Sequence, residues 1–117
     1  MFKILGIAPY EGLRELMTVL ADRRDDMILD AHTADYTDGL EIAENTDLSG
    51  YDAIISRGGI VDILRENLSI PVIAIQFSQY DILKAINLAK STGKNFAIVG
   101  FPRTVETADM LCKLLQY

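Results

Sequence analysis

Two hydrophobic patterns take turns along the chain. Short, nearly continuous apolar runs are typical of buried strands, and stretches with apolar residues every three or four positions are typical of helices that cover a sheet. The runs lie at 2–8, 27–31, 53–55, 72–75 and 96–100, and the helical stretches at 11–24, 36–43, 60–68, 80–91 and 102–115. This order predicts an α/β fold, a doubly wound, five-stranded parallel sheet of the flavodoxin-like type with strand order 2-1-3-4-5.

Composition adds size, location and charge to this prediction. The 117 residues are 50% hydrophobic, enough for one core, so we expect residues 1–117 to form a single lobe. The only cysteine is Cys112 and the chain starts without a basic and apolar leader, so we expect a cytoplasmic location. No apolar run is long enough to span a bilayer. A formal net charge of -6 opposes direct contact with nucleic acid or anionic lipid.

The strongest candidate for chemistry is the turn after the third predicted strand, Ser56-Arg57-Gly58-Gly59. It combines a hydroxyl, a guanidinium group and flexible backbone at the start of a helix, where the dipole is positive. Such a turn suits the carboxylate of an organic acid or a phosphate. The alternative is a plain turn with a solvated arginine.

Other loops are expected at the same edge of the sheet, where ligands gather in folds of this type. They contribute Pro9, Ser78, Tyr80 and Thr104 as further ligand-binding candidates. Ser78 also fits a helix cap, and Thr104 also fits the start of a helix. The loop at Pro9 lacks the hydroxyls that hold a flavin phosphate and the glycine spacing of a nucleotide loop, so we expect no cofactor.

A catalytic or metal site is harder to assemble from these residues. His32 is the only histidine and follows the second strand near the sheet edge, and Cys112 lies on the apolar face of the last helix. The sequence shows no cluster of potential metal ligands, so we expect no metal site. The third and fifth strands end without the aspartate and lysine of a receiver domain. We therefore expect no enzyme, with a flavodoxin-like or phosphotransfer enzyme and a ligand-free interaction module as the alternatives.

Several motifs in the second half occur together in one order. They are Asp52 to Gly59, Ser69-Ile70-Pro71-Val72, Ser78 with Tyr80-Asp81-Ile82-Leu83, and Ile98-Val99-Gly100-Phe101-Pro102. In combination they resemble the amino-terminal sensory region of the propionate catabolism activator family of sigma-54-dependent transcriptional regulators. Gln79 departs from the pattern, because a small residue such as glycine is expected there.

The resemblance implies a ligand-sensing domain with two flavodoxin-like lobes and a small organic acid bound between them. Ser56, Arg57, Gly58, Gly59, Ser78 and Tyr80 would then line one wall of the cleft. It also implies a second lobe, an ATPase domain and a DNA-binding domain as partners elsewhere in the regulator. Since the sequence stops at Tyr117, we expect a fragment or an isolated first lobe, and a homodimer that covers the surface meant for the second lobe.

Overall fold

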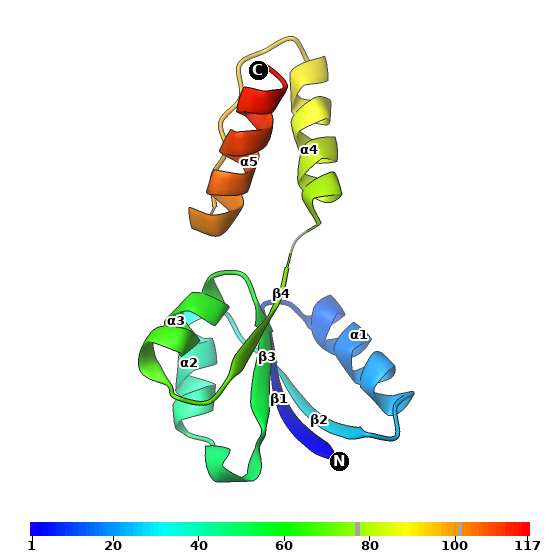
Figure 1. The fold of residues 1–117 in the computed structure, drawn as a ribbon, viewed down its shortest axis with the longest axis vertical. Helices are drawn as coiled ribbons and strands as arrows, with labels where there is room; N and C mark the ends of the chain where they lie inside the picture. Colours follow the sequence, from blue (N-terminus) through cyan, green and yellow to red (C-terminus); the bar gives the residue numbers. More distant parts are fainter. Residues whose placement is uncertain (77, 101) are drawn as a thin grey trace. The chain divides into compact units, whose positions relative to one another are not determined.

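The computed structural model describes residues 1–76, 78–100 and 102–117, and its chain divides into two compact units (Figure 1). The first unit is Met1–Ile75 and the second is Gln76–Tyr117. Phe101, which belongs to one of the motifs above, lies outside the described residues. The expectation of a single lobe over residues 1–117 stays a prediction, and each unit is described by itself.

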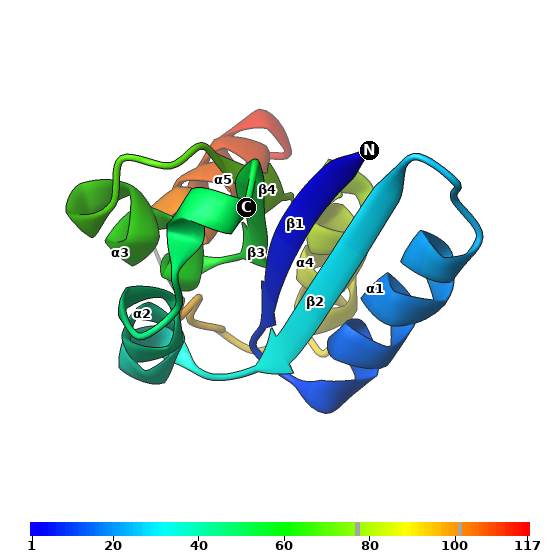
Figure 2. The ribbon, with the colours of Figure 1, turned by 90° about the horizontal axis from the view of Figure 1, so that it is seen from below.

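A parallel sheet with strand order β2-β1-β3-β4 forms the centre of the first unit (Figure 2). The strands are β1 (Phe2–Ala8), β2 (Met27–Thr33), β3 (Ala53–Arg57) and β4 (Val72–Ile75). Ile7 of β1 pairs with Ser56 of β3, so these two strands end side by side. The chain order reverses between them, and this is where a doubly wound sheet opens a ligand crevice.

Helices cover the two faces of this sheet unequally, with one helix on one face and two on the other (Figures 1 and 2). They are α1 (Glu11–Asp22) on the first face and α2 (Tyr36–Glu44) and α3 (Gly59–Asn67) on the second, with a short 3-10 helix at Leu48–Gly50. The larger core cluster includes Leu5, Ile54 and Leu64, all fully buried. The smaller cluster joins Leu13 and Met17 of α1 to the end of β1. The alternation of strand and helix patterns in the sequence therefore correctly predicted that helices pack on both faces of the sheet.

The second unit contains two helices that contact each other, α4 (Gln79–Ser91) and α5 (Pro102–Leu114). The prediction of a fifth strand over 96–100 is wrong, because these residues have no regular secondary structure and Val99 is 93% exposed. A strand needs a neighbour to satisfy its N–H and C=O groups, and the described part of the second unit contains no other strand. The predicted order 2-1-3-4-5 is thus corrected to 2-1-3-4.

None of the described helices combines the length and the apolar character that crossing a membrane would require.

Candidate functional site

The turn from β3 into α3 has a backbone shape that depends on glycine. Gly58 adopts φ +65° and ψ −142°, and Gly59 is the first residue of α3. A side chain at Gly58 would be strained by this φ, although a Cβ atom there would meet nothing within 4 Å. The turn is therefore open around its backbone, and it presents the positive end of α3 without a capping side chain.

Arg57 is the last residue of β3 and lies beside the loop that follows β1. Its Nη1 donates a hydrogen bond to the hydroxyl oxygen of Tyr10, with a distance of 3.1 Å. Tyr10 directly precedes α1 and follows Pro9, and its side chain is about half exposed. Pro9, Arg57, Gly58 and Gly59 therefore lie around the neighbouring ends of β1 and β3. Tyr10 was not among the predicted site residues, although its place after the first strand was a usable signal.

Ser56 points into the first unit. It is 1% exposed, and its Oγ donates a hydrogen bond of 2.7 Å to the carbonyl oxygen of Ile7. This bond ties β3 to β1 one residue before Arg57, so it helps to set the position of the guanidinium group. The hydroxyl already has an internal acceptor, and direct contact of Ser56 with a ligand stays a prediction.

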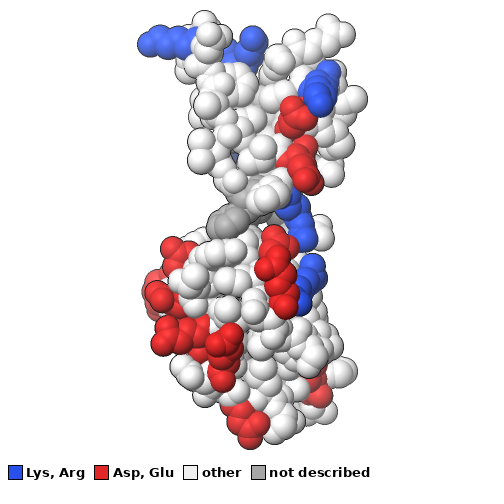
Figure 3. All heavy atoms as spheres, turned by 90° about the vertical axis from the view of Figure 1, so that its left-hand side faces the viewer, with Lys and Arg blue, Asp and Glu red and all other residues white. Residues whose placement is uncertain are grey.

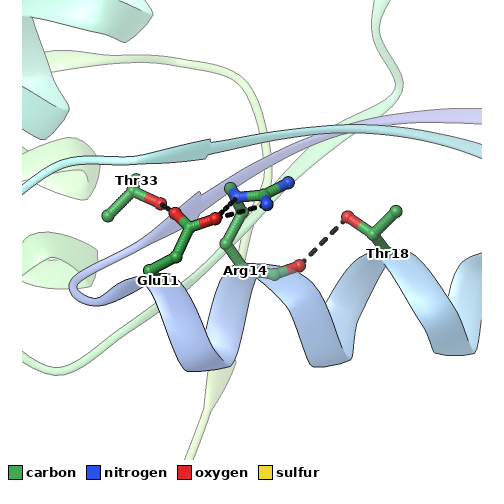
Figure 4. A network of polar contacts seen from close by, with 4 residues as sticks. All are labelled: Glu11, Arg14, Thr18 and Thr33. Carbon is green, nitrogen blue, oxygen red and sulfur yellow. Dashed lines mark hydrogen bonds and ion pairs between the residues drawn. The ribbon is translucent and has the colours of Figure 1, made fainter.

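A polar network holds the start of α1 against the end of β2 (Figure 4). The Glu11 carboxylate accepts hydrogen bonds from Arg14 at one oxygen and from the Thr33 hydroxyl, at 2.6 Å, at the other. Arg14 also accepts a hydrogen bond at its carbonyl oxygen from the Thr18 hydroxyl. The hydrogen bond from Arg14, followed by that from Thr33, lowers the pKa of Glu11 to about 2. Glu11 is thus ionised at neutral pH, with its charge balanced by Arg14.

Three predicted site residues belong to the second unit. Ser78 precedes α4 and accepts a hydrogen bond from the Tyr80 backbone N–H at 3.1 Å, so it caps the helix. Tyr80 is 66% exposed, with the Lys84 ammonium 5.5 Å from its ring centroid. Thr104 lies in the first turn of α5 and is half-buried. The grouping of these residues with Arg57 stays a prediction.

The residues considered for catalysis lie on elements other than the turn between β3 and α3. His32 is exposed on β2, the strand at one edge of the sheet. Cys112 is half-buried in α5. Within residues 1–76, 78–100 and 102–117, no three histidine, cysteine or acidic side chains are placed to share a metal ion.

Comparison with known families gives a match over most of the chain. The sequence model of the propionate catabolism activator family matches residues 23–117. The chain belongs to this family. The resemblance inferred from the motifs is confirmed, and the matched range includes Arg57, Ser78 and Tyr80 while it leaves out Pro9 and Tyr10. Comparison with curated proteins and with solved structures found no significant match.

Family membership gives this domain a general role in regulation. The family is a regulatory domain of transcriptional activators and is not a catalytic family. The structure adds an α/β parallel sheet of general flavodoxin-like character. The glycine turn at Arg57 is therefore a feature of a regulatory domain.

Proposed function

We propose that this domain senses a small organic acid or a similar anion at the carboxyl ends of β1 and β3. The observation that carries the proposal is the position of Arg57, at the end of β3 and directly before the open Gly58–Gly59 turn of α3. A carboxylate at this turn would meet the guanidinium group and the first amides of α3 together. Both are charge-complementary to it and form strong hydrogen bonds.

Neighbouring residues support the binding of an anion at this turn. Tyr10 holds one nitrogen of the guanidinium group and so restricts its orientation before a ligand arrives. Glu11 follows Tyr10 in the chain, but its negative charge is balanced by Arg14. In our proposal Pro9, Ser56, Ser78, Tyr80 and Thr104 complete the ligand wall, and no cofactor takes part.

The surface along α2 is acidic. Exposed acidic side chains lie along α2 and at its two ends, on the face seen in Figure 3. They are Asp35, Asp38, Glu41, Glu44 and Asp47. With a net charge of -6, such a surface repels both polyanions and small anions at long range. Specific donors at the β3–α3 turn are therefore needed to hold an anion, and we infer that this domain does not itself contact nucleic acid.

Family membership supports the remaining parts of the proposal. We propose that the domain acts within a cytoplasmic, sigma-54-dependent activator, in which the bound acid changes how a second sensory lobe meets the first. The signal would then pass to ATPase and DNA-binding domains. Binding energy can shift such an equilibrium only by the difference in affinity between the two states, so the acid must favour one arrangement of the lobes.

Isothermal titration calorimetry tests the binding step directly. The panel contains citrate-like tricarboxylates, short-chain acids and phosphorylated acids, each titrated into the wild-type chain and into Arg57→Ala. We expect saturable binding of a subset of the acids, weakened about tenfold to a hundredfold by Arg57→Ala, because a charged hydrogen-bond donor is lost.

Arg23→Ala is the matched control, because Arg23 is exposed and lies at the far end of α1 from Tyr10. It removes the same charge from the chain and leaves the turn intact. No heat with any acid, or equal affinity in Arg57→Ala and wild type, would contradict the proposal.

A further inference from the structure

One face of the sheet in the first unit is only half covered. On the side of α1, the helix packs on β1 and β2, and β4 is the outer strand at the opposite edge. Two adjoining hollows of about 500 and about 210 Å³ lie beside α1 on this face, and both are lined by Arg24, Met27 and Ile55. Parallel sheets are normally buried on both faces, so this groove is an unfilled position of the fold.

The walls of the groove are mainly apolar, and the charged side chains of Arg24, Asp26 and Asp52 also line it. Leu20 of α1, Ile73 and Ile75 of β4, and Ile55 of β3 contribute to its lining. Leu16 and Val19 continue the exposed apolar surface of α1, and about half of each side chain is exposed, as it is for Leu20 and Ile73. Contiguous exposed aliphatic side chains of this kind mark a surface that another element covers.

The chain also contains an apolar segment that could pair with the edge of this sheet. Residues 96–99 are Phe96, Ala97, Ile98 and Val99, a run with strand-forming side chains and no proline. In the described part of the second unit there is no strand to pair with them, and Val99 is 93% exposed. The run is followed by α5, where Met110 and Leu114 are also exposed.

We propose that residues 96–99 of a second copy of this chain add to the free edge of β4 as a parallel fifth strand. The α5 helix of that copy would then lie in the groove beside α1. Every ladder of the sheet is parallel, so a helix that follows an added parallel strand can return over the sheet in the usual right-handed crossover.

A second copy is the occupant that the chain itself supplies. Each copy offers the unpaired edge of β4 and one segment without a strand partner, so a reciprocal exchange between two copies uses both and closes the assembly at this edge. The main-chain hydrogen bonds of an added strand give affinity, and the apolar side chains fill the groove. This assembly does not depend on the proposed organic acid.

The first experiment measures mass in solution and identifies the contact. Light scattering after size-exclusion chromatography is expected to give a dimer for the 117-residue chain. Ile73→Cys and Ile98→Cys are placed in separate, differently tagged chains, both with Cys112→Ser, and the two chains are produced together. A short bismaleimide is expected to join them into a covalent dimer carrying both tags.

Leu88→Cys is the matched control for the cross-link. Leu88 is an aliphatic residue on α4 with 73% exposure, so a thiol at this position is accessible but lies outside the proposed contact. Ile73→Cys produced together with Leu88→Cys is expected to give little covalent dimer. Equal cross-linking at positions 88 and 98 would overturn the proposed pairing.

A charge variant tests the same contact without chemical modification. Val99→Asp is expected to weaken the dimer at least about tenfold, because the carboxylate would be buried beside β4, whereas Leu88→Asp is expected to leave it unchanged. Circular dichroism establishes that both variants retain the helical content of the wild type. The proposal would be overturned by a wild-type chain that is monomeric at all concentrations. It would also be overturned if a chain carrying both Ile73→Cys and Ile98→Cys cross-links only within itself.

Discussion

The two units of this chain start from similar sequence patterns and reach different structures. In the first unit the apolar run at 53–57 becomes β3, which is paired on both sides, and Ile54 is fully buried. In the second unit the run at 96–99 remains without a ladder, with Ile98 37% and Val99 93% exposed. An apolar, strand-forming sequence is therefore sufficient for a strand only where another strand can satisfy its backbone.

The largest expected difference between the units is in the loss of stability when one aliphatic side chain is shortened. That side chain is buried in the first unit and exposed in the second. Ile54→Ala is expected to lower the free energy of unfolding of the first unit by about 3 kcal/mol, because it leaves a cavity in the middle of the sheet. Leu88→Ala, on the exposed surface of α4, is expected to change stability by less than about 0.5 kcal/mol. Urea unfolding followed by circular dichroism measures both, and similar losses would show that the units are equally well packed.

The two serines that the sequence placed at the ligand site give a smaller contrast. Ser56→Ala removes the buried hydrogen bond to Ile7 and is expected to destabilise the first unit by about 1 kcal/mol. Ser78→Ala removes the cap of α4 and is expected to cost about as much, but with lost hydrogen-exchange protection at the first turn of α4. Exchange measured by mass spectrometry separates the two effects. Loss of protection around β3 in Ser78→Ala would contradict this assignment.

The polar network around Glu11 is expected to make the stability of the first unit depend on pH in the acid range. The folded-state pKa of Glu11 is about 2, below its ordinary value of 4.5, so the ionised carboxylate stabilises the fold fully above that ordinary value. This contribution is lost as the pH falls from about 4.5 to about 2. Glu11→Gln is expected to flatten the pH dependence of the unfolding midpoint in that window. An unchanged slope would show that Arg14 and Thr33 do not hold the carboxylate in solution.

The smallest effect is expected in the second unit, from its exposed ion pair. Lys113 and Asp109 lie four residues apart on α5 with an N–O distance of 2.9 Å, and both side chains are largely exposed. Water and salt screen such a pair, so Lys113→Ala is expected to leave the thermal midpoint within experimental error at about 0.15 M salt. A clear drop in the midpoint would mean that the pair is more shielded than its exposure indicates.

For the candidate site, the sequence predicted where residues lie in the fold but not which groups their side chains contact. The spacing of strands and glycines located Arg57 and the Gly58–Gly59 turn, because parallel strands end at one edge of a sheet. It could not find the hydrogen bond between Arg57 and Tyr10, which joins residues 47 positions apart. Nor could it show that the Ser56 hydroxyl turns inward to Ile7, since a strand residue can face either side.

The sequence by itself determined the helices, the parallel arrangement of the first four strands and the regulatory family. These depend on the period of apolar residues, on glycine at a positive φ and on motifs that need no partner to be read. Only the tertiary structure decided that the run at 96–99 forms no strand and that, within the first unit, α1 covers only half of one sheet face. Both depend on which backbone and apolar groups are available as neighbours, and a pattern along one chain does not specify those neighbours.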